Sequence, residues 1–229
     1  ITSTNALALD IRISSNNNNF TNNRFIGATN GAMIQQSSIT NTFVNNLIHG
    51  TSVGVYLLSG SNIFINNTIL GTNSYAVHAS SSSSHVFTGN NIASINSNGI
   101  YLSSSSSNSF TNNVLKSGAI DFISAGGSNN IVSNMTFNGT AYPTIASFTY
   151  SGNIQVDSAN SFASSGFDNV NEYLSVTNQS AAWVYLNISY NDTGLGFNEA
   201  KLRMYRYNSS LQIVSGTNGV DTTNNFVYA

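Results

Sequence analysis

The stretch FVNNLIHGTSVGVYLLSGSNIFINNTIL at residues 43–70 decides the fold, because it holds one complete repeat and the beginning of the next. Its first phrase, FVNNLI at 43–48, returns as FINNTI at 64–69. Outward from this stretch the phrase occurs four more times, as FTNNRF at 20–25, FTGNNI at 87–92, FTNNVL at 110–115 and, in weaker form, VSNMTF at 132–137. The first residues of these phrases are 21 to 23 positions apart, and such a period indicates a repeat architecture.

A second element lies between the phrases and has the form GVYLLSGS, as at 54–61. It recurs as AMIQQSS, AVHASSSS, GIYLSSSS and DFISAGGS at 32–38, 76–83, 99–106 and 121–128, and the incomplete LALDIRISS at 7–15 fits the same place. Each repeat therefore holds two or three short strands separated by corners rich in Asn, Gly and Ser. A leucine-rich repeat would need regular Leu positions followed by a helix, and the sequence has neither. We predict an all-β fold in which residues 1–143 form a parallel β-helix of about six to seven turns of ~22 residues.

Equivalent residues of successive turns stack on one another in such a coil, about 4.8 Å apart. The leading Phe of each phrase is expected in the interior, and the paired Asn at a corner. One Asn of each pair can adopt the left-handed backbone conformation, and its amide can bond the same amide of the next turn. The predicted ladder consists of Phe20, Phe43, Phe64, Phe87, Phe110, Asn22, Asn45, Asn66 and Asn112.

The period ends after Asn138–Gly139, close to the only proline, Pro143. Alternating runs follow, among them EYLSVTN at 172–178 and AWVYLNISYN at 182–191, and such runs are typical of short antiparallel strands. Residues 144–229 are therefore predicted to form a second domain, a small immunoglobulin-like antiparallel β-sandwich of five or six strands.

The N-x-F-x-N-N-x-I phrase followed by G-I-Y-L-S-S-S resembles the right-handed parallel β-helix repeats of NosD-like and carbohydrate-binding/sugar-hydrolysis (CASH) proteins, over residues 7 to about 140. Residues 170–229, with WVYLNISYNDTGLGFNEAKLRMYRYNSS at 183–210, are similar to a domain of archaeal surface proteins that often precedes a PGF-CTERM sorting tail. The resemblance implies a right-handed coil and a cell-surface protein, but no particular activity. In the archaeal domain a further strand normally follows, so we expect the final strand of the sandwich to be missing or supplied by a neighbour.

Asn and Ser supply 38 residues each, a third of the chain, whereas charged residues make up 6% and the formal net charge is −2. This balance excludes a nucleic-acid-binding protein, which needs clustered Lys and Arg. No apolar run approaches the roughly 20 residues of a membrane span, so the chain is not predicted to cross a membrane.

Candidate catalytic groups are few. In residues 1–140 the only acids are Asp10 and Asp121, which lie about five turns, or roughly 24 Å, apart and cannot act together on a glycosidic bond. Lys116 and Asp121 share one turn and are expected to form a surface ion pair. We therefore predict no catalytic residue and no enzymatic activity.

The three histidines, His49, His78 and His85, fall in neighbouring turns without a carboxylate or a metal-ligand spacing, so we expect them to be surface or corner residues. NosD-like proteins are associated with copper handling, but a chain with no Cys and three Met does not support that role. No cofactor is predicted, apart from a weak calcium site in the C-terminal module at the turns that hold Asp192 and Asp221.

Eight N-x-Ser/Thr sequences are candidate N-glycosylation sites, and their density suits an exported glycoprotein at the cell surface. They begin at Asn19, Asn66, Asn134, Asn138, Asn178, Asn187, Asn191 and Asn208.

The absence of clustered chemistry in a stiff, repetitive coil favours a structural function. We predict a subunit of an extracellular archaeal filament, sheath or surface layer, whose partners are copies of itself and covalently attached glycans. The coil begins within a repeat and the sandwich lacks a strand, so both ends are expected to present open edges. Self-association is assigned to Ile1, Leu7, Leu9, Ile11, Phe226 and Tyr228.

The alternative is a secreted carbohydrate-binding or adhesive module, which would need a stripe of exposed aromatic rings. Tyr56 and Tyr101 occupy similar registers, but two tyrosines make a poor platform.

Overall fold

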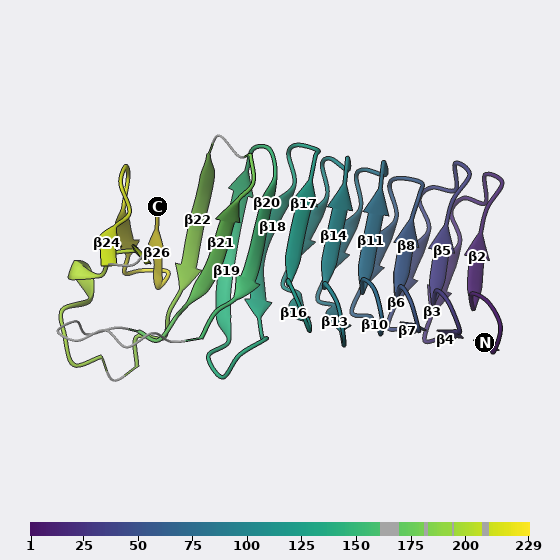
Figure 1. The fold of residues 1–229 in the computed structure, drawn as a ribbon, viewed down its shortest axis with the longest axis horizontal. Helices are drawn as coiled ribbons and strands as arrows, with labels where there is room; N and C mark the ends of the chain where they lie inside the picture. The colour runs from purple at the N-terminus through teal and green to yellow at the C-terminus, as the bar shows by residue number, and fades with distance from the viewer. Residues whose placement is uncertain (161–169, 181–182, 194, 208–210) are drawn as a thin grey trace.

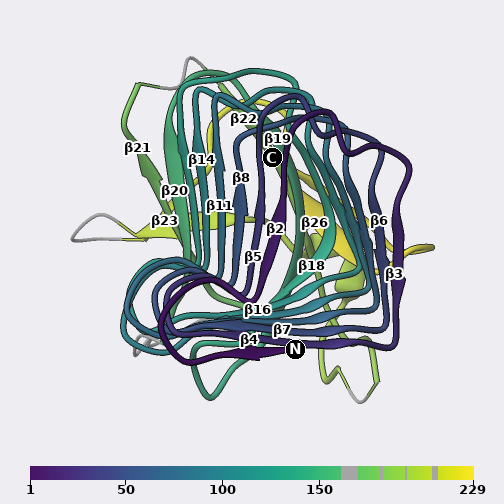
Figure 2. The same ribbon diagram turned by 90° about the vertical axis from the view of Figure 1, so that its right-hand side faces the viewer.

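The computed structural model describes residues 1–160, 170–180, 183–193, 195–207 and 211–229. Short strands stack along the long axis, with the N-terminus at one end and antiparallel strands at the other (Figure 1). Seen along that axis from the N-terminal end, each turn of the chain closes around three sides (Figure 2). The predicted all-β fold, with a parallel β-helix in its first part, is confirmed.

Each turn of the coil contributes one strand to each of three faces. The first face consists of β2 (Leu9–Ile11), β5 (Ala32–Ile34), β8 (Val55–Leu57), β11 (Val77–Ser80), β14 (Ile100–Ser103) and β17 (Phe122–Ala125). The second consists of β1 (Thr2–Ser3), β4 (Arg24–Gly27), β7 (Leu47–Gly50), β10 (Thr68–Gly71), β13 (Asn91–Ser94) and β16 (Val114–Lys116). The third consists of β3 (Asn19–Thr21), β6 (Thr42–Val44), β9 (Ile63–Ile65), β12 (Val86–Thr88) and β15 (Ser109–Thr111). The longer β18 (Ile131–Phe137) pairs with both β15 and β16 and so joins the second and third faces.

Side chains alternate between the interior and the outside, because successive residues of a strand point to opposite faces. The interior holds the predicted Phe column, in which Phe43, Phe64, Phe87 and Phe110 are almost completely buried. Consecutive rings from Phe20 to Phe110 stack with centroids 4.8, 4.7, 4.6 and 5.0 Å apart. These distances match the spacing of neighbouring strands, so the stacking follows directly from the register.

The two residues of each Asn pair have different roles. One adopts the left-handed backbone conformation and the other forms the amide ladder, whereas we expected a single residue to do both. The first Asn of each pair, at 22, 45, 66 and 112, has a left-handed φ between 53° and 58°. Gly89 takes this position in the fourth phrase with a φ of 68°, which explains why Gly replaces Asn there.

The hydrogen-bonded ladder runs one residue later than predicted, through the second Asn of each pair. The Asn46 amide donates to Asn67 Oδ1 over 2.9 Å, and the Asn67 amide donates to Asn90 Oδ1 over 3.0 Å. Each amide also donates to a backbone carbonyl; that of Asn67, for example, bonds the Phe43 carbonyl oxygen. The complete ladder is Asn23, Asn46, Asn67, Asn90 and Asn113.

A second ladder, which the sequence did not predict, lies just before the strands of the third face. It consists of Asn18, Asn41, Asn62, His85, Asn108 and Asn130. His85 replaces Asn in the middle: the Asn62 backbone N–H donates to His85 Nδ1, and the His85 backbone N–H donates to Asn108 Oδ1.

The antiparallel strands predicted after residue 143 continue the sheets of the coil. β19 (Thr144–Tyr150) pairs with β18, and β22 (Val184–Ser189) pairs with β19. β20 (Ile154–Ser158) pairs with β17, and β21 (Leu174–Asn178) pairs with β20. β25 (Gly219–Asp221) and β26 (Phe226–Tyr228) follow β22, while β23 (Tyr205–Tyr207) and β24 (Leu211–Ile213) form a separate two-stranded sheet after the 3-10 helix η1 (Glu199–Lys201). Phe122, Phe137, Phe148 and Tyr150 extend the core across the predicted domain boundary at 143, and the division into two independent domains stays a prediction.

Candidate functional site

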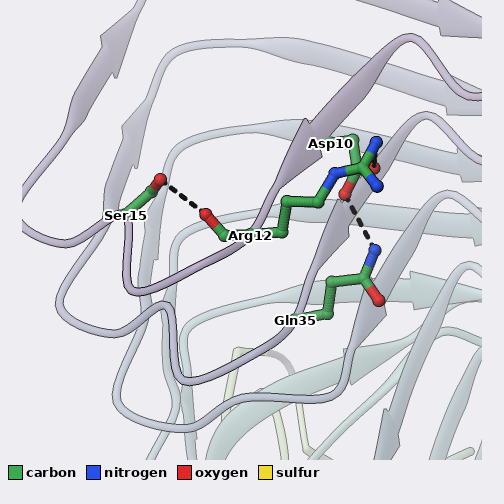
Figure 3. A network of polar contacts seen from close by, with 4 residues as sticks. All are labelled: Asp10, Arg12, Ser15 and Gln35. Atoms are coloured by element: carbon green, nitrogen blue, oxygen red, sulfur yellow. Dashed lines mark hydrogen bonds and ion pairs between the residues drawn. The ribbon is translucent and has the colours of Figure 1, made fainter.

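The acids of the coil do not form a catalytic pair. Asp10 lies in β2 of the first turn, where Arg12 Nη2 approaches Asp10 Oδ2 to 2.7 Å and the Gln35 amide donates to Asp10 Oδ1 over 3.0 Å (Figure 3). The Ser15 hydroxyl donates to the Arg12 carbonyl oxygen in the same network. Asp121 precedes β17 at the other end of the coil, so no second carboxylate of the coil stands beside Asp10.

Asp121 is not in the predicted surface ion pair. Lys116 is exposed, whereas Asp121 has none of its surface exposed. The Asp121 Oδ2 atom accepts hydrogen bonds from the Ser158 backbone N–H, over 3.0 Å, and from the Ser158 hydroxyl. The Asp121 backbone N–H in turn donates to Asp157 Oδ1. Burial and the neighbouring Asp121 charge raise the pKa of Asp157 to about 6.

The three histidines occupy three different environments. His49 Nε2 lies 3.0 Å from the Thr72 hydroxyl. His85 is fully buried, its Nε2 lies 2.7 Å from the Ser82 hydroxyl, and burial lowers its pKa to about 4. In the described part of the chain, no three residues of the types His, Cys, Asp and Glu gather closely enough to hold a metal ion.

His78 belongs to an aromatic stripe on the outside of the first face, larger than the two tyrosines that the sequence indicated. His78 stacks on Tyr56 at 4.8 Å and lies 5.0 Å from Tyr101, which stacks on Tyr75 at 4.8 Å. Burial lowers the pKa of His78. Because the rings cover one another's faces, few ring faces remain for a sugar, and the stripe is a poor carbohydrate platform.

A pair of exposed aromatic rings lies at the start of β22. Trp183 is 45% exposed and Tyr185 is 65% exposed, and their ring centroids lie 4.9 Å apart. Register places Tyr185 beside Thr149 and Thr149 beside Ile131, which is 47% exposed. A cavity of about 260 Å³ adjoins Trp183, lined by Asn129, Asn130, Ile131, Thr149 and Tyr150.

A second cavity, of about 320 Å³, has Glu172 and Asp192 among its lining residues. Burial raises the pKa of Glu172 to about 7. The predicted calcium residue Asp221 is occupied in its own turn, because Oδ1 accepts hydrogen bonds from the Thr223 and Asn224 backbone N–H groups. Within the described residues, neither Asp192 nor Asp221 belongs to a group of three or more His, Cys, Asp or Glu side chains. The calcium site at these turns stays a prediction.

The candidate glycosylation residues differ in accessibility. Asn19, Asn66, Asn134, Asn178 and Asn191 are exposed, whereas Asn138 and Asn187 are half-buried. Asn208 lies outside the described residues.

The predicted self-association residues also differ in their exposure and in whether they lie on an open strand edge. Ile1 is 69% exposed and Leu7 and Leu9 are half-buried, but Ile11 belongs to the buried core of the first turn. Phe226 and Tyr228 lie on β26, which pairs with β22 on one side and β25 on the other. These last two residues are therefore not on an open edge, contrary to the expectation.

The family comparison matches the part of the chain that forms the coil. The family described as "Periplasmic copper-binding protein (NosD)" matches residues 11–154, which is most of the chain. The chain belongs to the NosD family. No curated protein and no solved structure matches it.

This NosD-family chain is a surface or periplasmic β-helix module, and its family is consistent with a location outside the cytoplasm. No helix in the described part of the chain is long and apolar enough to cross a membrane. Its described side chains do not fit the copper that the family description names, because His49, His78 and His85 lie apart and the sequence has no Cys.

Proposed function

We propose that this NosD-family chain is a structural subunit of an extracellular surface assembly of archaeal type, a filament, sheath or surface layer. Copies of the chain, carrying covalently attached glycans, associate through open strand edges without catalysing a reaction. The observation that carries the proposal is the pair of end strands of one sheet. β2 lies at one end of the eight-stranded sheet and β21 at the other, and neither pairs with a further strand among the described residues.

The backbone of β2 offers hydrogen-bonding groups to a neighbour. Leu9 N–H bonds the Gly31 carbonyl and the Ile11 carbonyl accepts from Gln35 N–H, so residues 9 and 11 face the next turn. The backbone of Asp10, between them, therefore faces outward. An outward row of this kind is a template for adding a strand.

The outer edge of β21 also presents backbone hydrogen-bonding groups, which can pair with those of β2 from another copy. Gln179 N–H bonds the Asn153 carbonyl, so alternation turns the N–H of Val176 away from β20 and toward the outer edge. Val176 is itself 37% exposed. Pairing β2 of one copy with β21 of the next continues the sheet from copy to copy, and such a head-to-tail contact builds an open filament.

A substitution in β21 tests this contact. Val176→Pro removes the outward N–H and leaves the bonds to β20 in place, so the variant should stay monomeric where the parent chain assembles. Analytical ultracentrifugation over a range of concentrations and electron microscopy of the 229-residue chain measure the difference. Val176→Thr keeps the N–H and a branched side chain, and it should assemble as the parent does. A parent chain that is monomeric at every concentration contradicts the proposal.

A second candidate function, carbohydrate binding or adhesion, is favoured by the surface around Trp183. Trp183 and Tyr185 present exposed rings, Thr149 and Asn129 add a hydroxyl and an amide, and no charged side chain of the described residues lines the cavity. Aromatic rings beside neutral polar groups suit a neutral saccharide.

The only tryptophan of the chain makes this candidate simple to test. Titration with chitotetraose, cellotetraose and mannotetraose should change the fluorescence of Trp183, and Tyr185→Ala should weaken binding about tenfold through the loss of one ring contact. Tyr142→Ala, which removes an exposed ring elsewhere, is the matched control. Unchanged fluorescence with all three oligosaccharides rejects carbohydrate binding at this surface.

A further inference from the structure

The strongest unassigned feature is a buried carboxylate that has no cation beside it. Asp121 has none of its surface exposed, and no backbone N–H, hydroxyl or amide group donates to its Oδ1 atom. The one ion pair of the described residues, Arg12 with Asp10, lies in the first turn of the coil. An ionised carboxylate is costly to bury unless a proton or a cation neutralises it.

A second carboxylate faces the first. Antiparallel pairing sets Phe122 of β17 opposite Val156 of β20, so the residues just outside this pair, Asp121 and Asp157, also lie opposite each other. Their carboxyl groups are within hydrogen-bonding reach. Two carboxylates this close repel each other. A single proton leaves one negative charge in the buried site, whereas a divalent cation neutralises both.

The surroundings hold the Asp121 carboxylate in one orientation. The Gly139 backbone N–H donates to Ser158 Oγ over 2.8 Å, and the Ser158 hydroxyl and backbone N–H both donate to Asp121 Oδ2. A Cβ atom at Gly139 would lie 2.7 Å from Ser158 Oγ, so a larger residue at this position would displace the Ser158 hydroxyl. With Oδ2 fixed in this way, Oδ1 stays available as a ligand.

We propose that Asp121 and Asp157 bind a hard divalent cation, calcium or magnesium, where the coil meets the antiparallel strands. Both side chains supply only oxygen atoms, which these cations prefer, and water fills the remaining coordination positions. Asp157 is partly exposed and gives the ion a path from solvent. The cation would clamp β20 to β17. This site requires neither self-association nor carbohydrate binding.

Thermal unfolding of the full chain at neutral pH tests the site in three solutions: EDTA, about 5 mM calcium chloride, and about 5 mM magnesium chloride. If the cation concentration is about ten times the Kd of the site, the Tm should be about 3 °C higher than in EDTA. The calcium and magnesium arms show which ion is preferred. Isothermal titration calorimetry with the same salts should detect one binding site per chain.

Asp157→Asn gives the decisive comparison. Its amide removes the repulsion and can donate to Asp121 Oδ1, so the variant should fold, unfold at a higher temperature than the parent in EDTA, and lose the response to both cations. Asp10→Asn, at the other end of the coil, should keep the response. Equal Tm values for the parent in all three solutions overturn the proposal in favour of a shared proton. A response that persists in Asp157→Asn overturns it by placing the ion elsewhere.

Discussion

The coil and the antiparallel strands that follow it satisfy their buried polar groups in different ways. In the coil, the same amide recurs at the same corner, and Asn67 both accepts a bond from Asn46 and donates one to Asn90. Where the coil meets the antiparallel strands, the buried polar atoms include carboxyl oxygens of Asp121 and Glu172, and these oxygens meet single, unrepeated partners or none.

The difference follows from the chemistry of the two side chains. An amide carries donors and an acceptor, so it can bond its own copy one turn away without any charge. An ionised carboxylate only accepts, so a column of carboxylates would repel itself and leave oxygens unsatisfied. A repetitive coil can therefore bury Asn in every turn, whereas the fully buried carboxylate, Asp121, lies where the period ends, and Asp10 in the first turn is paired with Arg12.

The largest expected effect comes from breaking the amide ladder. Asn67→Ala should lower the free energy of unfolding by about 4 kcal/mol, because the Asn46 amide and the Phe43 carbonyl lose buried partners. Asn66→Ala, at the exposed neighbouring position with its left-handed φ, should cost only about 1 kcal/mol. Urea unfolding of both variants measures the contrast, and equal losses would disprove the division of tasks within the pair.

An intermediate effect should come from acid, through the histidine that replaces Asn in the second ladder. The ring of His85 contacts the uncharged Asn62 and Ser82, and its pKa is lowered to about 4 by burial. As the pH falls, His85 therefore becomes protonated in the unfolded chain before it does in the folded chain. The stabilisation present above the unfolded pKa, near 6.5, is lost as the pH falls toward 4. The full loss is about 3 kcal/mol.

Urea unfolding across that pH range measures this loss in the parent, in His85→Asn and in His49→Asn. The His85→Asn variant restores the amide and should flatten the pH dependence, whereas His49→Asn should keep it. A parental slope in His85→Asn would show that other groups cause the acid sensitivity.

The smallest expected effect concerns the single turn whose corner differs from the others. Gly89→Ala should cost about 1 kcal/mol, because Gly89 has a φ of 68° and Ala adopts that conformation poorly. Gly89→Asn should cost less, since Asn takes the same conformation at four equivalent corners. Thermal unfolding compares the two variants, and an Ala variant as stable as the Asn variant would contradict the steric explanation.

Much of the coil could be predicted from the sequence because the same phrase recurs in every turn. The phrase beginning at Phe20, Phe43, Phe64, Phe87 and Phe110 fixed the register, and the register placed the rings in one column. The sequence does not show which Asn of each pair forms the ladder, because the backbone conformation at the corner decides which side chain points toward the next turn. The second ladder escaped prediction because His85 interrupts the run of Asn.

The sequence by itself determined the repeat, the all-β coil and its membership of a β-helix family, because identical residues at a fixed interval must stack on their own copies. Only the tertiary structure decided that Asp121 contacts Asp157 rather than Lys116, that β26 pairs with a strand on each side, and that Trp183 and Ile131 line one cavity. These contacts join residues that no period relates. They arise because antiparallel strands turn back onto the end of the coil, and where a chain turns back is set by packing as a whole rather than by any local pattern.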